Sequence, residues 1–212
     1  TANATGDPAT NEDDVTHRIG IVKFSGNESD QIGNDTYRSD GNTYNYSQAV
    51  QDLTSVTGNV QSLKNAVNEL AAAGSTRTDF GLNQAQRVLD GDWQHGLGGA
   101  REEAKQVVVV FTDGEPSTFS NWSGGVAANA VNLAKDLKDD KVTVYTIGMF
   151  EDADPSDTDG RFNKYMNGVS SNYPNAEVTN WRGDRTQDWD DCKLGTRVTE
   201  GNYYFAADDA EE

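Results

Sequence analysis

An aspartate that follows a long apolar run is the first residue of this chain whose position suggests chemistry. The stretch 105–117 reads Lys-Gln-Val-Val-Val-Val-Phe-Thr-Asp-Gly-Glu-Pro-Ser. Its apolar, β-branched core predicts a short strand that is buried on both faces in the middle of a parallel sheet. Asp113 then lies just past the C-terminal end of that strand, the edge of open α/β sheets where ligands bind. Asp113 is therefore a candidate site residue, although Asp113-Gly114 is also an ordinary turn sequence.

A second group of oxygen-bearing side chains lies in the segment 74–79, Gly-Ser-Thr-Arg-Thr-Asp. It precedes an apolar pattern over Phe80–Leu89 with helical spacing. Thr78 or Asp79 would cap this helix. From the residue pattern alone, a role at the helix entry is also the simpler interpretation of Thr76.

The elements around Asp113 alternate in a way that predicts the fold class. After the apolar strand, apolar residues at helical spacing predict a helix over 126–137, and a further strand is predicted over 142–149. A strand, a helix and a strand in this order form a βαβ unit, which implies a right-handed crossover and a parallel sheet. We expect an α/β fold with a doubly wound, mostly parallel central sheet flanked by helices.

The rest of the chain is predicted to belong to the same domain, residues 1–212. Residues 1–17 are expected to be a mobile lead-in, and 151–201 an acidic loop, a short helix and a polar insertion in which Trp181 and Trp189 need cover. The remaining predicted elements are a strand at 18–25, a hairpin at 37–46 around Asp40-Gly41, helices at 60–70 and 162–169, and a last strand at 202–207.

Charge and composition limit the classes of partner. The 212 residues include 17 Lys and Arg against 35 Asp and Glu, a net charge of −18. Nucleic acids and anionic membrane surfaces are therefore disfavoured and cations favoured, although the same charge also fits a general adaptation for solubility or salt. No segment approaches the roughly 18 apolar residues that a membrane span needs. Cys192 is the only cysteine, which excludes an internal disulfide and a multi-cysteine zinc site.

No enzyme motif stands out in the sequence. The two histidines, His17 and His95, have no Gly-x-Ser-x-Gly motif near them, and no phosphate-binding loop or dinucleotide fingerprint follows a predicted strand. A calcium-binding EF-hand around 155–166 fails because Pro155 occupies the first ligand position and Met166 the position of the bidentate glutamate. We expect a protein that is not an enzyme.

Three segments together resemble the von Willebrand factor A domain. They are Gly74 to Thr78, the strand that ends Val-Phe-Thr-Asp-Gly-Glu at 110–115, and Val-Tyr-Thr-Ile-Gly at 144–148. Their order and spacing match the family, and the similarity extends from about Arg18 to the C-terminus. Within the family, the segment from Asn163 to Pro174 and on to Tyr204 is most similar to A domains of bacterial surface and pilus-tip adhesins.

The resemblance implies a metal-ion-dependent adhesion site, in which loops at the sheet edge bind Mg²⁺ or Mn²⁺ through oxygen atoms. Carried over to this chain, the metal ligands are Thr76 and Asp113, and Thr78 and Asp79 are weaker candidates that would surround the ligands. The family's main ligand loop, Asp-x-Ser-x-Ser after its first strand, has no match before Arg18, so the first strand and first helix are expected to be missing from this stretch of chain. We therefore expect the metal to bind weakly or not at all here. Asp154 to Thr158 matches Asp-x-Ser-x-Thr, but its position after a later strand does not fit the family topology.

The resemblance also implies a function. We expect an extracellular, cell-surface adhesion or ligand-binding module, whose metal in the complete domain accepts a carboxylate from a protein partner, a host extracellular-matrix protein being one candidate. Neither nucleic acid nor membrane insertion is expected. The alternative is a structural A domain that scaffolds a surface fibre or pilus without metal. Finding Asp-x-Ser-x-Ser upstream of this stretch would favour the first.

Overall fold

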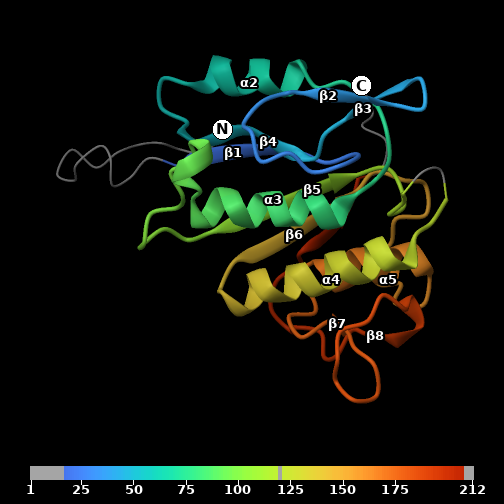
Figure 1. Ribbon diagram of the computed structural model, residues 1–212. Helices are drawn as coiled ribbons and strands as arrows, with labels where there is room; N and C mark the ends of the chain where they lie inside the picture. Colours follow the sequence, from blue (N-terminus) through green and yellow to red (C-terminus); the bar gives the residue numbers. More distant parts are fainter. Residues whose placement is uncertain (1–16, 119–120, 208–212) are drawn as a thin grey trace. The chain divides into compact units, whose positions relative to one another are not determined.

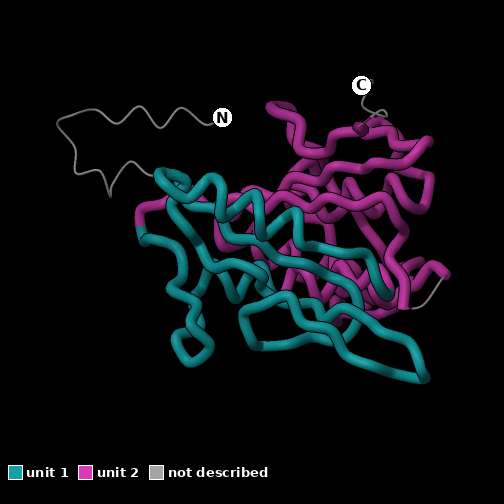
Figure 2. Tube along the Cα trace, turned by 90° about the horizontal axis from the view of Figure 1, so that it is seen from above, with its two compact units in different colours: residues 1–74, 84–102 teal, residues 75–83, 103–212 magenta. Residues whose placement is uncertain are grey.

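The computed structural model describes residues 17–118 and 121–207 (Figure 1). The chain divides into two compact units, residues 1–74 with 84–102 and residues 75–83 with 103–212 (Figure 2). The predicted mobile lead-in, residues 1–17, lies outside the described residues except for His17. That one domain spans 1–212 stays a prediction.

The first unit is built on antiparallel strands. Strand β1 (Arg18–Lys23) pairs with β4 (Gln48–Ser55), and β2 (Thr36–Ser39) pairs with β3 (Asn42–Asn45) in a hairpin. At the hairpin turn Asp40 and Gly41 both have positive φ, 50° and 82°, as a two-residue turn that matches the strand twist requires. The predicted strand at 18–25 and the predicted hairpin are confirmed. Strand β4 was not predicted.

Helices complete the first unit. They are α2 (Val60–Asn68), the C-terminal part of α3 (Thr78–Asp90) and the short 3₁₀ helix η1 (Trp93–His95). The buried core consists of Ala49, Val88 and Leu97, with Val22, Ile32 and Leu53 packed against it. These side chains come from β1, β4, α3 and the adjoining loops, so the unit has a small core of its own.

The second unit contains the parallel sheet. Strands β5 (Val107–Thr112), β6 (Thr143–Gly148) and β9 (Tyr204–Ala206) are parallel in the order β5-β6-β9. Helix α4 (Gly124–Asp139) connects β5 to β6, and it packs with α5 (Arg161–Val169) and with β6 (Figure 1). The predicted βαβ unit, and with it the α/β fold class, is confirmed.

The environment of β5 differs from the prediction. Among the described strands β5 pairs only with β6, so it lies at one edge of its sheet instead of in the middle. Val110 is buried, but Val107, Val109 and Phe111 keep 43%, 46% and 54% of their surface exposed. The prediction of a strand buried on both faces is wrong for the odd-numbered residues.

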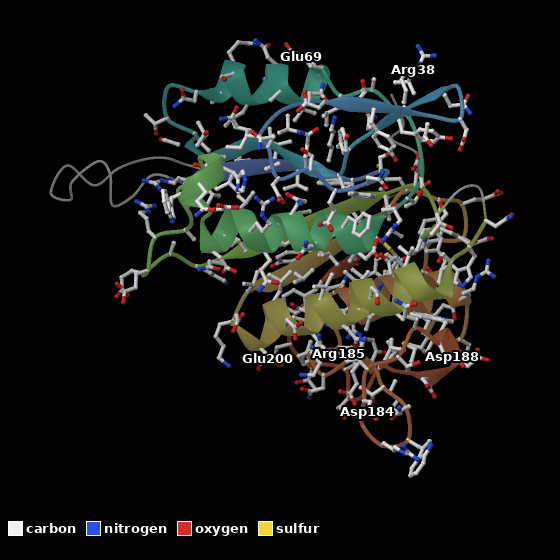
Figure 3. The ribbon with its side chains drawn as sticks, in the orientation of Figure 1. Arg38, Glu69, Asp184, Arg185, Asp188 and Glu200 are labelled. Carbon is white, nitrogen blue, oxygen red and sulfur yellow. The ribbon has the colours of Figure 1, made fainter. Side chains whose placement is uncertain are left out.

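The insertion between α5 and β9 is anchored on α4. Its strands β7 (Glu177–Val178) and β8 (Cys192–Lys193) pair with each other, and the 3₁₀ helix η2 (Trp189–Asp191) precedes β8. Asn132 of α4 donates from its amide to the Val178 carbonyl at 3.1 Å and accepts from the Val178 N–H at 2.9 Å. Arg185, labelled in Figure 3, forms a bidentate ion pair with Asp136 of the same helix.

The two tryptophans of the insertion have different environments. Trp189 packs edge to face on Trp122, with ring centroids 5.4 Å apart. Trp181 is 85% exposed, so the expectation that it needs cover is wrong. The Arg182 guanidinium lies over the Trp181 ring, 4.6 Å from the ring centroid, and no other ring or cation contact of Trp181 is found among the described residues.

No helix within the described ranges is long and apolar enough to cross a bilayer.

Lys138 of α4 is a buried cation that ties the end of α5 to the helix. Its ammonium donates to the carbonyls of Gly168, Ser170 and Tyr173 at 2.8, 3.2 and 3.0 Å. Burial lowers the pKa of Lys138 to about 7, whereas the three acceptors favour the ammonium. Lys138 thus provides hydrogen bonds to carbonyls at the C-terminal end of α5, where a helix leaves its last carbonyls without a partner in the helix.

We expect Lys138→Ala to lower the free energy of unfolding by about 2–4 kcal/mol, because it leaves buried carbonyls unpaired and opens a cavity. Lys135→Ala is the matched control on the same helix. Its ion pair with Asp139 is exposed, so the change should cost at most about 0.5 kcal/mol. Urea denaturation of both variants measures the difference. Equal losses would contradict the anchoring role of Lys138.

Candidate functional site

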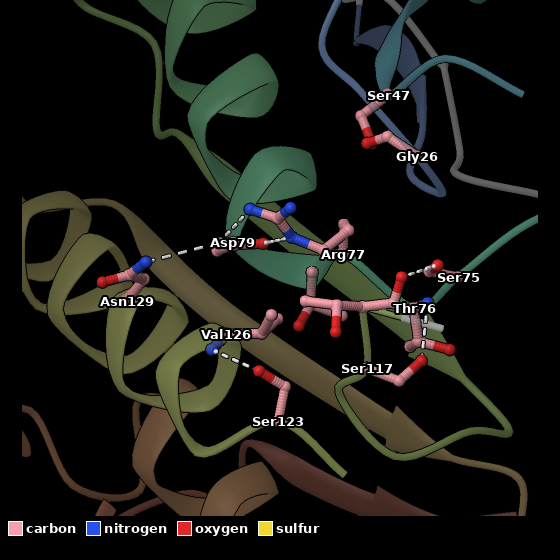
Figure 4. A network of polar contacts seen from close by, with 12 residues as sticks. Gly26, Ser47, Ser75, Thr76, Arg77, Asp79, Ser117, Ser123, Val126 and Asn129 are labelled. Atoms are coloured by element: carbon pink, nitrogen blue, oxygen red, sulfur yellow. Dashed lines mark hydrogen bonds and ion pairs between the residues drawn. The ribbon is translucent and has the colours of Figure 1, made fainter. Parts of the chain in front are cut away.

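The candidate site begins where the segment before α3 contacts the loop after β5. The Thr76 N–H donates to the Ser117 hydroxyl at 3.1 Å, and the Ser117 N–H donates to the Thr76 carbonyl at 3.0 Å. The hydroxyl of Ser75 donates to the Thr118 carbonyl at 2.6 Å. Figure 4 shows Ser75, Thr76 and Ser117 gathered at this junction. Two segments about 40 residues apart are thus joined by main-chain and hydroxyl hydrogen bonds, which fix where the Thr76 side chain lies.

Asp113 occupies the turn that this junction places beside Thr76. The buried hydroxyl of Thr112 holds the turn, since it donates to the Gly114 carbonyl at 2.9 Å and accepts from the Gly114 N–H at 3.3 Å. A Cβ atom at Gly114 would lie 3.2 Å from the Thr76 hydroxyl oxygen. Glycine therefore permits the turn and the hydroxyl to approach closely. Asp113 itself is exposed at this edge.

The carboxylate of Asp79 is committed to an internal ion pair. Asp79 is buried and accepts two hydrogen bonds of 2.8 Å from Arg77, and the Asn129 amide lies 3.5 Å away (Figure 4). The Arg77 guanidinium also stacks on Phe80, 3.4 Å from the ring centroid. This bidentate geometry neutralises the carboxylate. Asp79 therefore stabilises the segment that carries Thr76 through its ion pair with Arg77.

The hydroxyl of Thr78 is likewise used inside the unit. Thr78 is buried and accepts a hydrogen bond of 2.6 Å from the Tyr165 hydroxyl of α5. Burial raises the pKa of Tyr165, which keeps its hydroxyl protonated as a donor. Thr78 and Asp79 are the first two residues of α3, so they lie in its first turn instead of capping it as expected.

The loop after β6, which matches Asp-x-Ser-x-Thr, satisfies its own carboxylates. Asp154 accepts from the N–H and the hydroxyl of Ser156 at 2.8 and 2.7 Å. Asp157 accepts from the Gly160 N–H, which is the main cause that lowers its pKa, and from Asn163 of α5. The hydrogen bonds of this loop thus stabilise the N-terminal end of α5.

In the part of the chain that the structure describes, no group of three or more His, Cys, Asp or Glu side chains could hold a metal ion.

One ion pair beside the site was not predicted. Glu115 accepts two hydrogen bonds, of 2.8 and 2.7 Å, from Arg161 at the start of α5, and the guanidinium lies 4.6 Å above the Trp122 ring. These residues are far apart in sequence, and no local pattern marks Arg161 as the partner of Glu115. The pair ties the loop that carries Asp113 to α5.

The comparison with protein families decides the classification. A family model described as the von Willebrand factor type A domain matches residues 9–182. The chain belongs to the von Willebrand factor type A family. The three segments that carried the resemblance, the approach of Thr76 to the Asp113 turn and the parallel β5-β6 pair all lie in the matched range. The closer similarity to bacterial adhesins and the missing first loop stay predictions.

Other comparisons add little to this A domain. No curated protein matches it. A crystal form of proximal thread matrix protein 1 from the mussel byssus is similar, with 18% identity and a TM-score of 0.40, over 72% of this chain and 30% of that one. The conserved hypothetical protein BatB from Bacteroides thetaiotaomicron has 14% identity and a TM-score of 0.39, over 90% of this chain and 71% of that one. This chain thus spans less than a third of the mussel protein.

We expect Arg77→Ala to lower the free energy of unfolding by about 3–5 kcal/mol, because it leaves the buried Asp79 carboxylate without its partner. The double variant with Asp79→Ala should regain at least about 1 kcal/mol of that loss. The exposed pair of Arg185 and Asp136 provides the control, and Arg185→Ala should cost at most about 1 kcal/mol. Denaturant titration of the wild type, Arg77→Ala, Asp79→Ala, the double variant and Arg185→Ala measures these differences. Additive losses at Arg77 and Asp79 would contradict the coupling.

Proposed function

We propose that this A domain is an extracellular, cell-surface adhesion or ligand-binding module without enzymatic activity. Its contact surface would be the sheet edge that bears Thr76 and Asp113. In the complete domain a Mg²⁺ or Mn²⁺ ion at that edge would take a carboxylate of a protein partner as its last ligand. An extracellular-matrix protein of a host is one candidate partner.

The observation that carries this proposal is the approach of two separate loops. Thr76 lies next to the turn of Asp113 because main-chain and hydroxyl hydrogen bonds join 75–76 to 117–118. A hydroxyl and a carboxylate of this kind are the ligands that hard divalent cations prefer. The acidic chain, with a net charge of −18, also attracts cations to the surface.

The described residues offer too few oxygen ligands to coordinate a Mg²⁺ ion by themselves. Mg²⁺ requires near-octahedral coordination and gives up its water reluctantly. Thr76 and Asp113 offer one hydroxyl and one carboxylate, since Asp79 is paired with Arg77 and Thr78 accepts from Tyr165. Further ligands, such as those of an Asp-x-Ser-x-Ser loop, would have to come from the complete domain.

The second candidate function is a structural A domain that works without metal in a surface fibre or pilus. The internal contacts of Thr78 and Asp79 favour it, because they use polar groups of the loop to stabilise the fold. A scaffold needs a rigid loop and no vacant ligand positions. The two functions differ in whether chelation changes partner binding.

We expect this chain alone to bind Mg²⁺ with a dissociation constant weaker than about 1 mM, because two side-chain ligands cannot replace the hydration shell of the ion. Isothermal titration calorimetry with the wild-type chain and with Asp113→Ala tests this. Both titrations should give the same small heats. Micromolar affinity that Asp113→Ala abolishes would show that this chain holds a complete site.

In the complete domain, we expect binding to a protein partner to require Mg²⁺ or Mn²⁺, and to be lost in chelator and in Thr76→Ala and Asp113→Ala. Each substitution removes an oxygen that would orient the ion. Asp140→Ala is the matched control, because Asp140 is an exposed aspartate at the end of α4, just before β6 begins. Surface plasmon resonance against immobilised matrix proteins, with Mg²⁺ or chelator, measures all four proteins.

Binding that survives chelation and both substitutions would instead support the metal-free function. The contact would then involve the part of the insertion that lies between β7 and β8. There Trp181 is 85% exposed and could anchor a partner as exposed aromatic residues do at interfaces. Trp181→Ala separates this outcome from the proposed one, because it leaves the loops of Thr76 and Asp113 unchanged.

A further inference from the structure

A tripeptide with one guanidinium and one carboxylate lies in the part of the insertion between β7 and β8. Its sequence is Arg182-Gly183-Asp184. All three residues are exposed, and a Cβ atom placed on Gly183 would meet no other atom within 4 Å. Both charged side chains are therefore presented to solvent, and neither belongs to the buried core.

Asn180 fixes the conformation of this tripeptide. Its amide oxygen accepts from the main-chain N–H groups of Arg182 and Asp184, at 2.8 and 3.1 Å. Its main-chain carbonyl accepts from the Gly183 N–H at 3.0 Å, and its N–H donates to the Asp184 carbonyl at 2.9 Å. Gly183 has a φ of 86°, which glycine adopts without strain. The turn is thus held in one conformation before any partner binds, which reduces the entropy lost on binding.

The ends of the turn are attached to the second unit. Arg185 forms its bidentate ion pair with Asp136 of α4, and Thr179 and Arg185 form an antiparallel β-bridge. The Lys193 ammonium donates to the Thr179 carbonyl at 3.0 Å. All of these residues belong to the second unit. The anchoring of the tripeptide is therefore a property of that unit alone.

The Arg182 guanidinium is positioned by an aromatic ring and keeps its hydrogen-bond donors available. It lies over the Trp181 ring, 4.6 Å from the centroid. Among the described residues its side chain forms no ion pair and no hydrogen bond. A guanidinium that stacks through its face keeps the N–H groups at its edge for other partners. A carboxylate of a binding partner can therefore accept two parallel hydrogen bonds from Arg182.

The Asp184 carboxylate, labelled in Figure 3, has an oxygen atom to offer. Its Oδ2 atom accepts a long hydrogen bond of 3.4 Å from the Asn180 amide, and within the described ranges its Oδ1 atom has no hydrogen-bond partner. No ion pair joins Asp184 to Arg182 or to another cation of the described residues. An exposed carboxylate oxygen of this kind is a ligand that hard divalent cations prefer.

We propose that this loop is a ligand for a protein receptor that binds Arg182 with a carboxylate and Asp184 through a divalent cation that the receptor holds. Gly183 separates the two charges and, because it has no side chain, lets the receptor approach the main chain closely. The loop thus donates a carboxylate to a metal of its partner, whereas the proposed sheet-edge site accepts one. The inference goes beyond the proposed function and does not use Thr76 or Asp113.

The charges of the loop and of the chain favour this class of partner. One guanidinium beside one carboxylate gives the tripeptide no net positive charge, and the chain carries −18. Nucleic acids and anionic membranes therefore do not fit the loop. A divalent cation suits Asp184 better than a basic side chain of the receptor does, because its double charge attracts an acidic surface more strongly.

Surface plasmon resonance on the immobilised chain tests the proposal. The probe is the ectodomain of an integrin that binds Arg-Gly-Asp peptides, a receptor with a divalent cation in its binding site. The wild-type chain should bind it in Mn²⁺ and release it in chelator, and a soluble Gly-Arg-Gly-Asp-Ser peptide should compete where Gly-Arg-Gly-Glu-Ser does not. A chain that fails to bind in Mn²⁺ would overturn the proposal. Binding that survives chelator would overturn the assignment of a cation to Asp184.

Conservative variants test each charged group without a change of net charge. Asp184→Glu displaces the carboxylate by one methylene group and should weaken binding at least about tenfold, because the geometry of a metal ligand tolerates little displacement. Asp140→Glu makes the same change at the exposed end of α4 and should leave the affinity unchanged. Arg182→Lys should also cost at least about tenfold, since an ammonium lacks the fork of two parallel donors. Equal affinities of Asp184→Glu and the wild type would exclude the tripeptide as the ligand.

Two further variants test the fixed turn and separate this proposal from the proposed function. Asn180→Ala keeps both charged side chains but removes the acceptor of two main-chain hydrogen bonds, and it should weaken binding about fivefold. An affinity that Asn180→Ala leaves unchanged would contradict the role of the turn. Asp113→Ala should bind the integrin as the wild type does. Loss of binding in Asp113→Ala would overturn the assignment of the contact to the loop, because it would place the contact at the sheet edge.

Discussion

The parallel pairing of β5 with β6 is the constraint on which the rest of the second unit depends. The register runs without interruption from Val107 opposite Thr143 to Thr112 opposite Gly148. A parallel pair needs a crossover, and α4 provides it. Because α4 and α5 both pack on β6, the even-numbered side chains such as Val110, Val144 and Thr146 are buried. The same geometry places the loop after β5 at the edge of the sheet, where Asp113 lies.

The sequence predicted the elements whose local pattern agrees with their tertiary environment. The helix over 126–137, the strand over 142–149 and the hairpin around Asp40-Gly41 are all present. Strand β4 was missed because Gln48–Ser55 carries mostly polar residues and little strand signal. The apolar run of β5 indicated burial on both faces, but burial depends on which elements cover each face. Exposure of Trp181 at 85% could not be predicted for the same reason.

The candidate site was predicted in part. The resemblance named Thr76 and Asp113, and the structure places the Thr76 hydroxyl against the turn that Asp113 occupies. The sequence could not show that Asp79 pairs with Arg77 or that Thr78 accepts from Tyr165, because both contacts depend on side-chain directions or on a partner far along the chain. A carboxylate that a neighbouring guanidinium neutralises contributes stability to the loop, whereas a free one contributes a ligand. Sequence patterns do not distinguish these roles.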